Sequence, residues 1–148
     1  MAITLTVSNK FKYEMGIESV DLSSDTVKVI LMESGFVYDK DADGTYANVS
    51  ADEITSAGGY TVGGEALTVD SAWAQDNTND RAAITWVDKT FTASGAAFDT
   101  FCAAILVLTV DATTDTTDVV IGCIEFGQDI SVADGASFQL QDMGYNKD

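Results

Sequence analysis

Apolar and polar residues alternate with a period of two in several short segments of this 148-residue chain. The alternation is clear at residues 3–7, 27–31, 82–87, 90–93 and 138–141. Successive side chains of an extended backbone point to opposite faces, so this period is typical of a strand with one buried face. The pattern therefore predicts a mainly β fold built from many short strands.

One segment departs from the alternation, because Phe101–Val110 is almost entirely apolar. A strand that is apolar on both faces is predicted to lie between two packed layers. The polar loop 111–118 and a second apolar run at 119–126 follow it, which predicts a hairpin with an exposed acidic tip. We expect this hairpin to form the centre of the fold.

The same hairpin bears on the two cysteines. If Val110 pairs with Val119, Cys123 lies opposite Leu106, and Cys102 is then roughly 13 Å away along the strand. That separation is beyond the reach of a disulfide bond. Two free thiols that pack as small hydrophobic side chains are therefore expected.

A single helix is predicted, over Asn9–Ile17, with Ser8 or Asn9 as its N-cap and Gly16 limiting its length. Short strands, glycine-rich corners and one short N-terminal helix favour an antiparallel β-sandwich or barrel. The length suits one domain spanning residues 1–148. The chain has no proline, so its edge strands lack the protection that proline gives against pairing.

Residues 58–64 contain four glycines around Tyr60 and carry no catalytic side chain. Glycine tolerates a positive φ, so the segment predicts a sharp structural corner that Tyr60 packs against. Trp86 is expected in the core because it lies within a strand pattern. Trp73, flanked by alanines, is a candidate interface anchor.

Together these segments resemble a family of small structural proteins found in tailed bacteriophages. The resemblance rests on Gly59-Tyr60, Gly63-Gly64 and Leu67, followed by Gln75-Asp-Asn-Thr-Asn-Asp-Arg-Ala82. Further segments in matching order extend it over nearly the whole chain: 9–12, 21–29, 120–127 and 129–132. The resemblance implies a virion component, assembled in the host cytoplasm, and offers no active-site signature to transfer.

Within a particle, the favoured expectation is a decoration or cement protein that binds the major capsid protein and forms homo-oligomers there. The N-terminal strand and helix, residues 1–17, are the expected docking arm. A tail, tail-tube or head-tail connector component is the alternative in the same particle. A calcium-dependent surface or carbohydrate-binding module is an alternative from another class.

The charge of the chain argues against nucleic acid as a partner. Seven Lys and Arg residues oppose 24 Asp and Glu residues, which gives a formal net charge of −17. Binding phosphates requires clustered basic residues, so nucleic-acid binding is not expected. No apolar stretch has the length of a membrane span, and the N-terminus does not read as a secretory leader, so no membrane partner is expected either.

The residue types also argue against an enzyme. Without histidine the chain cannot build the common Ser-His or Cys-His nucleophile pairs, and two cysteines do not complete a zinc site. The glycine block lacks the Gly-Lys-Ser/Thr ending of a phosphate-binding loop. A pair of carboxylates for glycoside hydrolysis, drawn from Glu53, Glu65 and Glu125, is the remaining catalytic alternative.

One loop has the start of a calcium-binding pattern, with Asp39, Asp41 and Asp43 in alternation and a glycine after them. The twelfth position, normally a glutamate, is Ser50, and the flanks, 46–49 among them, look extended. Two interpretations stay open: a solvated acidic turn, or a weak calcium site with Asp52 or Glu53 as late ligands. No other cofactor is expected.

Overall fold

A computed structural model describes residues 4–109 and 113–147 of the chain. Its helical segments are short: α1 is Asn9–Gly16, α2 is Tyr46–Val49 and the 3-10 turn η1 is Ser50–Asp52. The rest of the regular structure is β: β1 Leu5–Val7, β2 Thr26–Glu33, β3 Glu65–Ala66, β4 Val69–Asp76, β5 Arg81–Trp86, β6 Lys89–Thr92, β7 Phe101–Thr109, β8 Val119–Ile130, β9 Ser137–Leu140 and β10 Gly144–Lys147. The predicted mainly β class is confirmed.

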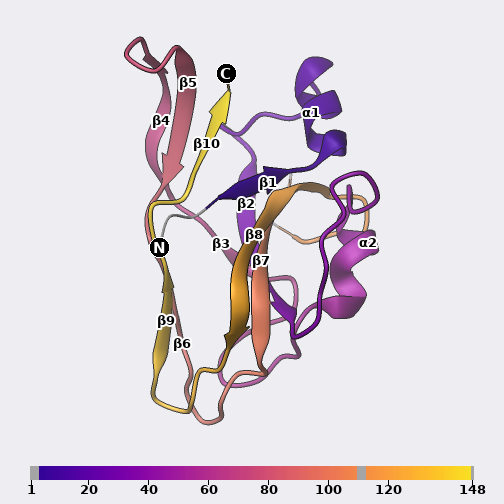
Figure 1. The fold of residues 1–148 in the computed structure, drawn as a ribbon, viewed down its shortest axis with the longest axis vertical. Helices are drawn as coiled ribbons and strands as arrows, with labels where there is room; N and C mark the ends of the chain where they lie inside the picture. Colours follow the sequence, from indigo (N-terminus) through magenta and orange to yellow (C-terminus); the bar gives the residue numbers. More distant parts are fainter. Residues whose placement is uncertain (1–3, 110–112, 148) are drawn as a thin grey trace.

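All strand pairs in the described residues are antiparallel, and they form three sheets. The main sheet has the order β1-β8-β7-β2-β3, the second has the order β10-β5-β4, and β6 pairs with β9. Figure 1 shows the two smaller sheets stacked along one side of the main sheet, with α2 on its other side. The arrangement is a sandwich with a partial third layer.

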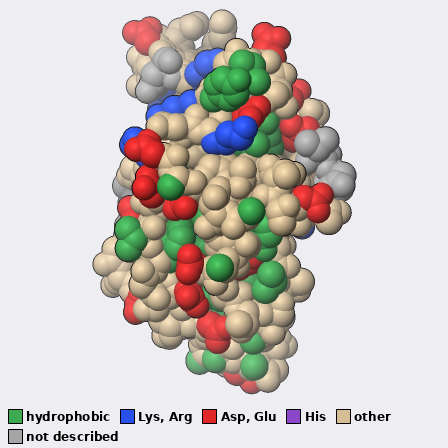
Figure 2. Space-filling view, turned by 90° about the vertical axis from the view of Figure 1, so that its right-hand side faces the viewer, with side chains coloured by type: hydrophobic (Ala, Val, Ile, Leu, Met, Phe, Trp, Pro, Cys, Tyr) green, Lys and Arg blue, Asp and Glu red, His purple; other side chains and the backbone are tan. Residues whose placement is uncertain are grey.

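The main sheet is apolar on both faces because both are covered. One face, with Val29 and Leu106, packs against Ile84, Trp86 and other side chains of the smaller sheets. The opposite face forms a second cluster, which includes Ile30, Ile105, Val107, Val120, Cys123 and, from α2, Tyr46 and Val49. β7 lies in the middle of this sheet and is buried along nearly its whole length, as its sequence predicts. Acidic side chains are scattered over the face of the molecule that Figure 2 shows.

The glycine block forms the predicted corner between η1 and β3. Gly58, Gly59, Gly63 and Gly64 all have positive φ. The ring of Tyr60 is buried where these glycines turn the chain, and it lies within about 6 Å of the rings of Phe91 and Phe98, at centroid distances of 6.1 and 6.3 Å. The corner places the chain against the edge of β2, where β3 adds to the main sheet.

The segment Tyr46–Val49 is helical, so its predicted extended conformation is wrong. It is a second short helix in addition to the predicted α1. Its start is fixed by Asn48, whose Oδ1 accepts hydrogen bonds from the N–H of Thr45 at 3.0 Å and from its hydroxyl at 2.7 Å. Tyr46 and Val49 stand three residues apart, which is the helical spacing that turns both onto the main sheet. Packing on the sheet decides the conformation of this short segment.

The central hairpin is confirmed, but the predicted register is wrong. Val119 lies opposite Leu108, and Cys123 lies opposite Ile105, with an irregularity between Leu106 and Val107 that shifts the pairing. Val110, the predicted partner of Val119, lies outside the described residues. Both cysteines are free thiols, as expected. Cys123 is buried, whereas Cys102 is half-buried and its thiol donates to the carbonyl oxygen of Glu33 at 3.2 Å.

Candidate functional site

A buried carboxylate, Glu53, is the best-formed polar centre among the described residues. Only 7% of Glu53 is exposed. Its Oε2 accepts a hydrogen bond from the hydroxyl of Tyr46 at 2.6 Å, and its Oε1 accepts from the hydroxyl of Tyr60 and from the N–H of Gly63 at 2.9 Å. The Tyr60 hydroxyl in turn accepts from the N–H of Leu31 at 3.1 Å. Four separate chain segments are joined through these groups.

The donors around Glu53 make this centre structural. A carboxylate without a basic partner is costly to bury unless hydrogen bonds satisfy its oxygens, and here three donors do so. The cluster fastens α2 and η1 to the glycine corner and to β2. Burial raises the pKa of the Tyr60 and Tyr46 hydroxyls above the ordinary value, and the neighbouring Glu53 raises it further.

These tyrosines make stability depend on alkaline pH. Burial raises the pKa of Tyr38, Tyr46 and Tyr60 above 10.0 in the folded chain, whereas in the unfolded chain they ionise near that value. Their contribution is therefore complete below pH 10 and is lost as the pH rises through the folded pKa. We expect the free energy of unfolding, measured by urea titration, to fall steeply between about pH 10 and pH 12.

The double variant Tyr46→Phe and Tyr60→Phe is the control for this pH dependence. It removes two of the three buried hydroxyls, so its free energy of unfolding should fall less steeply with pH than that of the parent chain. An equal slope in the two proteins would show that other groups cause the alkaline transition.

The proposed calcium ligands lie together in one loop, but their oxygens are used by the loop itself. Asp43 accepts from the N–H of Asp39 at 2.8 Å, and Asp39 accepts from the N–H of Asp41 at 2.9 Å. Asp41 accepts from the side-chain amide of Asn9 and pairs with Lys40 at 3.0 Å. Such contacts close an acidic turn against the start of α1.

No group of three or more acidic, cysteine or histidine side chains is placed to hold a metal ion within residues 4–109 and 113–147. Glu53, one of the proposed late ligands, points into the core. The calcium site at Asp39, Asp41 and Asp43 stays a prediction.

The three glutamates considered for glycoside hydrolysis are held in different places. Glu65 lies on β3 and pairs with Lys89 at 2.5 Å, and Glu125 is exposed on β8. β7 and β2 lie between those strands, so the two are separated by about 14 Å across the sheet. Catalytic carboxyl pairs are at most about 9.5 Å apart. Since Glu53 is enclosed by its donors, the arrangement does not favour glycoside hydrolysis.

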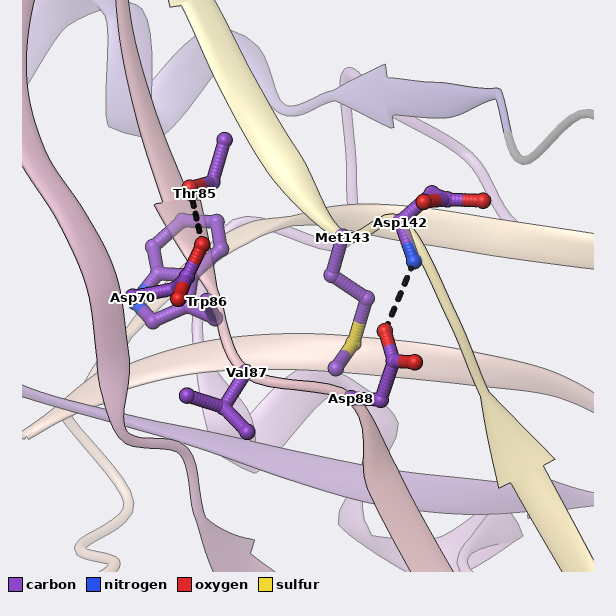
Figure 3. Close-up of a pocket in the computed structure, with 7 residues that line it drawn as sticks. All are labelled: Asp70, Thr85, Trp86, Val87, Asp88, Asp142 and Met143. Atoms are coloured by element: carbon purple, nitrogen blue, oxygen red, sulfur yellow. Dashed lines mark hydrogen bonds between the residues drawn. The ribbon is translucent and has the colours of Figure 1, made fainter.

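A hollow of about 450 Å³ opens beside β5 and β10, and the sequence predicts no binding role for the residues that line it. Its apolar wall includes Trp86 and Met143, and three carboxylates stand around it (Figure 3). Asp88 accepts from the N–H of Asp142 at 3.0 Å, and Asp70 accepts from the hydroxyl of Thr85 at 3.4 Å. Asp88 therefore links the two loops beside the hollow, and Asp70 links β4 to β5.

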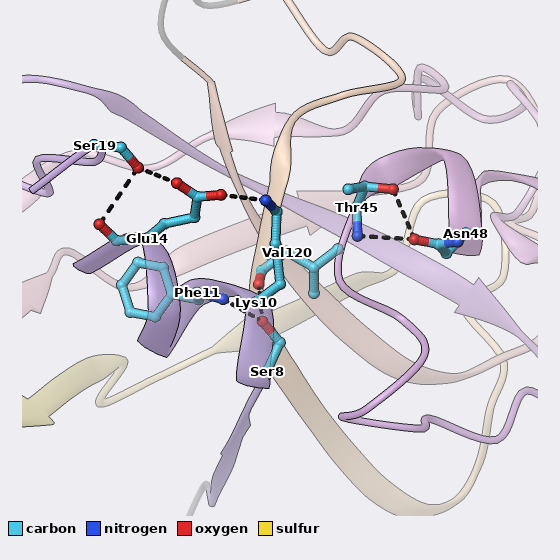
Figure 4. A network of polar contacts seen from close by, with 8 residues as sticks. All are labelled: Ser8, Lys10, Phe11, Glu14, Ser19, Thr45, Asn48 and Val120. Carbon is cyan, nitrogen blue, oxygen red and sulfur yellow. Dashed lines mark hydrogen bonds and ion pairs between the residues drawn. The ribbon is translucent and has the colours of Figure 1, made fainter. Parts of the chain in front are cut away.

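The predicted docking arm, residues 1–17, contains β1 and α1, and its first three residues lie outside the described part. Ser8 joins the two elements: its hydroxyl donates to the carbonyl of Val120 at 2.5 Å and accepts from the N–H of Phe11 at 2.9 Å (Figure 4). Phe11 is fully buried and packs edge-on against Tyr145. The predicted helix is confirmed, with Ser8 as its N-cap and its end at Gly16.

β1 covers only part of the edge of β8. Its residues 5–7 pair with residues 122–124, whereas β8 continues to Ile130. Among the described residues, no strand pairs with the outer edge of β8 at 125–130. An unpaired edge presents backbone N–H and C=O groups that an added strand can bind.

Comparison with known proteins adds no identification. Family models, curated proteins and solved structures were each searched, and none matches the chain. No helix in the described part of the chain is long and apolar enough to cross a membrane.

Proposed function

We propose that this chain is a non-enzymatic structural protein of a bacteriophage particle, which decorates the capsid by binding the major capsid protein. The observation that carries the proposal is the structural role of the residues on which the family resemblance rests. Its glycines form the corner beside β3, and its tyrosine holds Glu53 in the core. The most distinctive residues of the chain thus support shape and take no part in a reactive site.

The open edge of β8 supports a docking role. Its neighbour β1 belongs to the arm, so a partner strand added at residues 125–130 would contact the arm as well. Backbone pairing at such an edge gives affinity without special side chains. On a capsid, many equivalent weak contacts of this kind add up to firm attachment.

Purified particles of the phage that encodes the chain provide the direct test. We expect the protein in washed virions, in a molar ratio to the major capsid protein that approaches one to one, as measured by gel densitometry. A tail or connector component would be present in far fewer copies, which would replace the capsid assignment with that alternative. Its absence from virions would overturn the proposal as a whole.

Binding through the arm is tested by deleting Met1–Ser8. We expect the truncated protein to bind particles that lack the native protein about tenfold more weakly or worse, in a sedimentation assay with labelled protein. Because Ser8 also caps α1, a second variant, Gly122→Ala, displaces β1 alone: an added Cβ would lie 2.4 Å from the carbonyl oxygen of Thr6. Gly95→Ala, outside the arm and the open edge of β8, is the control, because an added Cβ there would meet nothing within 4 Å.

Unchanged binding of both arm variants, with melting curves that show folded protein, would exclude the arm from docking. Weaker binding by Gly95→Ala to the same extent would show that the assay reports general stability.

A further inference from the structure

α1 and its C-cap residue, Ile17, carry two large apolar side chains on the outward side that the fold does not bury. Phe11 and Met15 face the interior, whereas Tyr13 and Ile17, four residues apart, lie together on the opposite face. They are 61% and 54% exposed. Figure 2 shows hydrophobic side chains gathered at the end of the molecule that bears α1, with Lys and Arg side chains beside them.

The charged residues of this helix are basic near its N-terminus and acidic near its C-terminus, which is the opposite of the order that stabilises an isolated helix. Lys10 and Lys12 lie in its first half, and Glu14 and Glu18 lie in its second half and just beyond it. The helix dipole favours acidic residues at the N-terminus and basic residues at the C-terminus. α1 has neither an acidic residue in its first turn nor a basic residue in its last.

This segment is also electrically balanced in a strongly acidic chain. Residues 9–18 contain two basic and two acidic side chains, whereas the whole chain carries −17. Two copies of such a chain repel each other over most of their surfaces. They meet with least repulsion where the local charge sums to zero, and α1 is such a place.

We propose that α1 packs antiparallel against α1 of a second copy of this chain, about a twofold axis. Tyr13 and Ile17 of the two copies then form the apolar centre of the contact. Lys10 pairs with Glu14 of its own helix, and in the dimer it also lies beside the exposed Glu18 of the other copy, so the reversed charge order becomes complementary. The two helix dipoles are also antiparallel, and the contact is isologous because each copy offers the same surface.

The neighbouring surface has room for this contact to widen. A hollow of about 320 Å³ lies between α1 and the strands β4, β5 and β10, lined in part by Met15, Trp73 and Lys147. An eight-residue helix is only about 12 Å long, so the helix pair by itself buries a small area. We therefore expect a weak dimer in solution, with a Kd of about 0.1–1 mM.

Sedimentation equilibrium of the isolated chain tests the contact without reference to a capsid, so its result is independent of the proposed function. We expect a monomer–dimer equilibrium over concentrations up to about 1 mM. The double variant Tyr13→Ser and Ile17→Ser should remain monomeric with an unchanged melting temperature, because both side chains are exposed. Val37→Ser, which removes an apolar side chain that is 80% exposed elsewhere, should dimerise like the parent chain.

Charge reversal distinguishes the antiparallel helix pair from other contacts. Glu14 is mostly buried and pairs with Lys10 of its own helix, so the acidic residue to reverse is Glu18, which is exposed. Lys10→Glu and Glu18→Lys should each weaken self-association at least about tenfold, because like charges then face each other across the axis. An equimolar mixture of the two variants should form heterodimers. The double variant Lys10→Glu and Glu18→Lys should dimerise with itself, since it restores opposite charges across the contact.

Two outcomes would overturn the proposal. One is a parent chain that stays monomeric at the highest concentration. The other is a dimer whose strength is indifferent to Tyr13, Ile17 and the charge reversals, which would place the contact on another surface of the molecule.

Discussion

Replacing Gly64 by alanine is expected to lower the free energy of unfolding by about 3–5 kcal/mol. A Cβ on Gly64 would lie 2.3 Å from the carbonyl oxygen of Val29 and 2.5 Å from Cγ2 of Ile30. Its φ of +72° adds strain, because L side chains rarely adopt that conformation. The added methyl group would force the glycine corner away from β2, against which it is packed.

Urea unfolding of Gly64→Ala and of Gly35→Ala separates the steric clash of the added Cβ from the backbone strain at positive φ. Gly35 has a φ of +88°, but a Cβ there would meet nothing within 4 Å. The control should therefore lose only the strain component, about 1–2 kcal/mol. Equal losses in the two variants would contradict the close approach of the corner to β2.

The second large effect is expected at Glu53. Glu53→Gln should cost about 2–4 kcal/mol of stability, because an amide nitrogen cannot accept a hydrogen bond and leaves a buried donor unsatisfied. Three donors converge on the native carboxylate, from Tyr46, Tyr60 and Gly63. Glu125→Gln is the matched control: the side chain is exposed, and the change should stay within about 0.5 kcal/mol.

A double-mutant cycle shows whether the cluster acts as a unit. Glu53→Gln and Tyr60→Phe are combined, and the free energies of unfolding of the four proteins are compared by urea titration. We expect the double variant to be more stable than the sum of the single losses predicts, by about 1 kcal/mol or more. Additive losses would mean that Tyr60 and Glu53 stabilise the fold independently.

The parts of the fold that the sequence predicts well are those where one pattern repeats locally. The alternation of Val27, Val29 and Leu31 corresponds to β2, and the apolar run from Phe101 corresponds to β7. Ser8 is recognisable as an N-cap because its chemistry acts within one helical turn. The glycine corner is recognisable because positive φ restricts the residue type.

Strands without such a pattern were missed. β4, Val69–Asp76, is mostly exposed on both faces, so its sequence shows no clear alternation. It pairs with β5 through two irregularities, which break any regular period. β10, Gly144–Lys147, is short and largely polar, and it is a strand because it pairs with β5. Tertiary pairing defines both strands.

The buried hydrogen-bonded cluster around Glu53 also cannot be predicted from the sequence. As an acidic residue in a strongly acidic chain, Glu53 reads as part of the surface, and its burial depends on three donors from two other segments, α2 and the glycine corner. The spacing of Tyr46 and Tyr60, seven residues before and seven after it, is visible in the sequence, but only the path of the corner turns both hydroxyls toward the carboxylate.

The pairing of β1 with β8 fixes when the arm can be completed during synthesis. Thr6 lies opposite Cys123, so β1 waits for a partner strand that is synthesised much later than β1 itself. β2 likewise waits for β7, to which it is paired along its length. A nascent chain shorter than about residue 119 therefore lacks β8, which pairs with both β7 and β1, and only the synthesis of β8 brings the N-terminal strand into place.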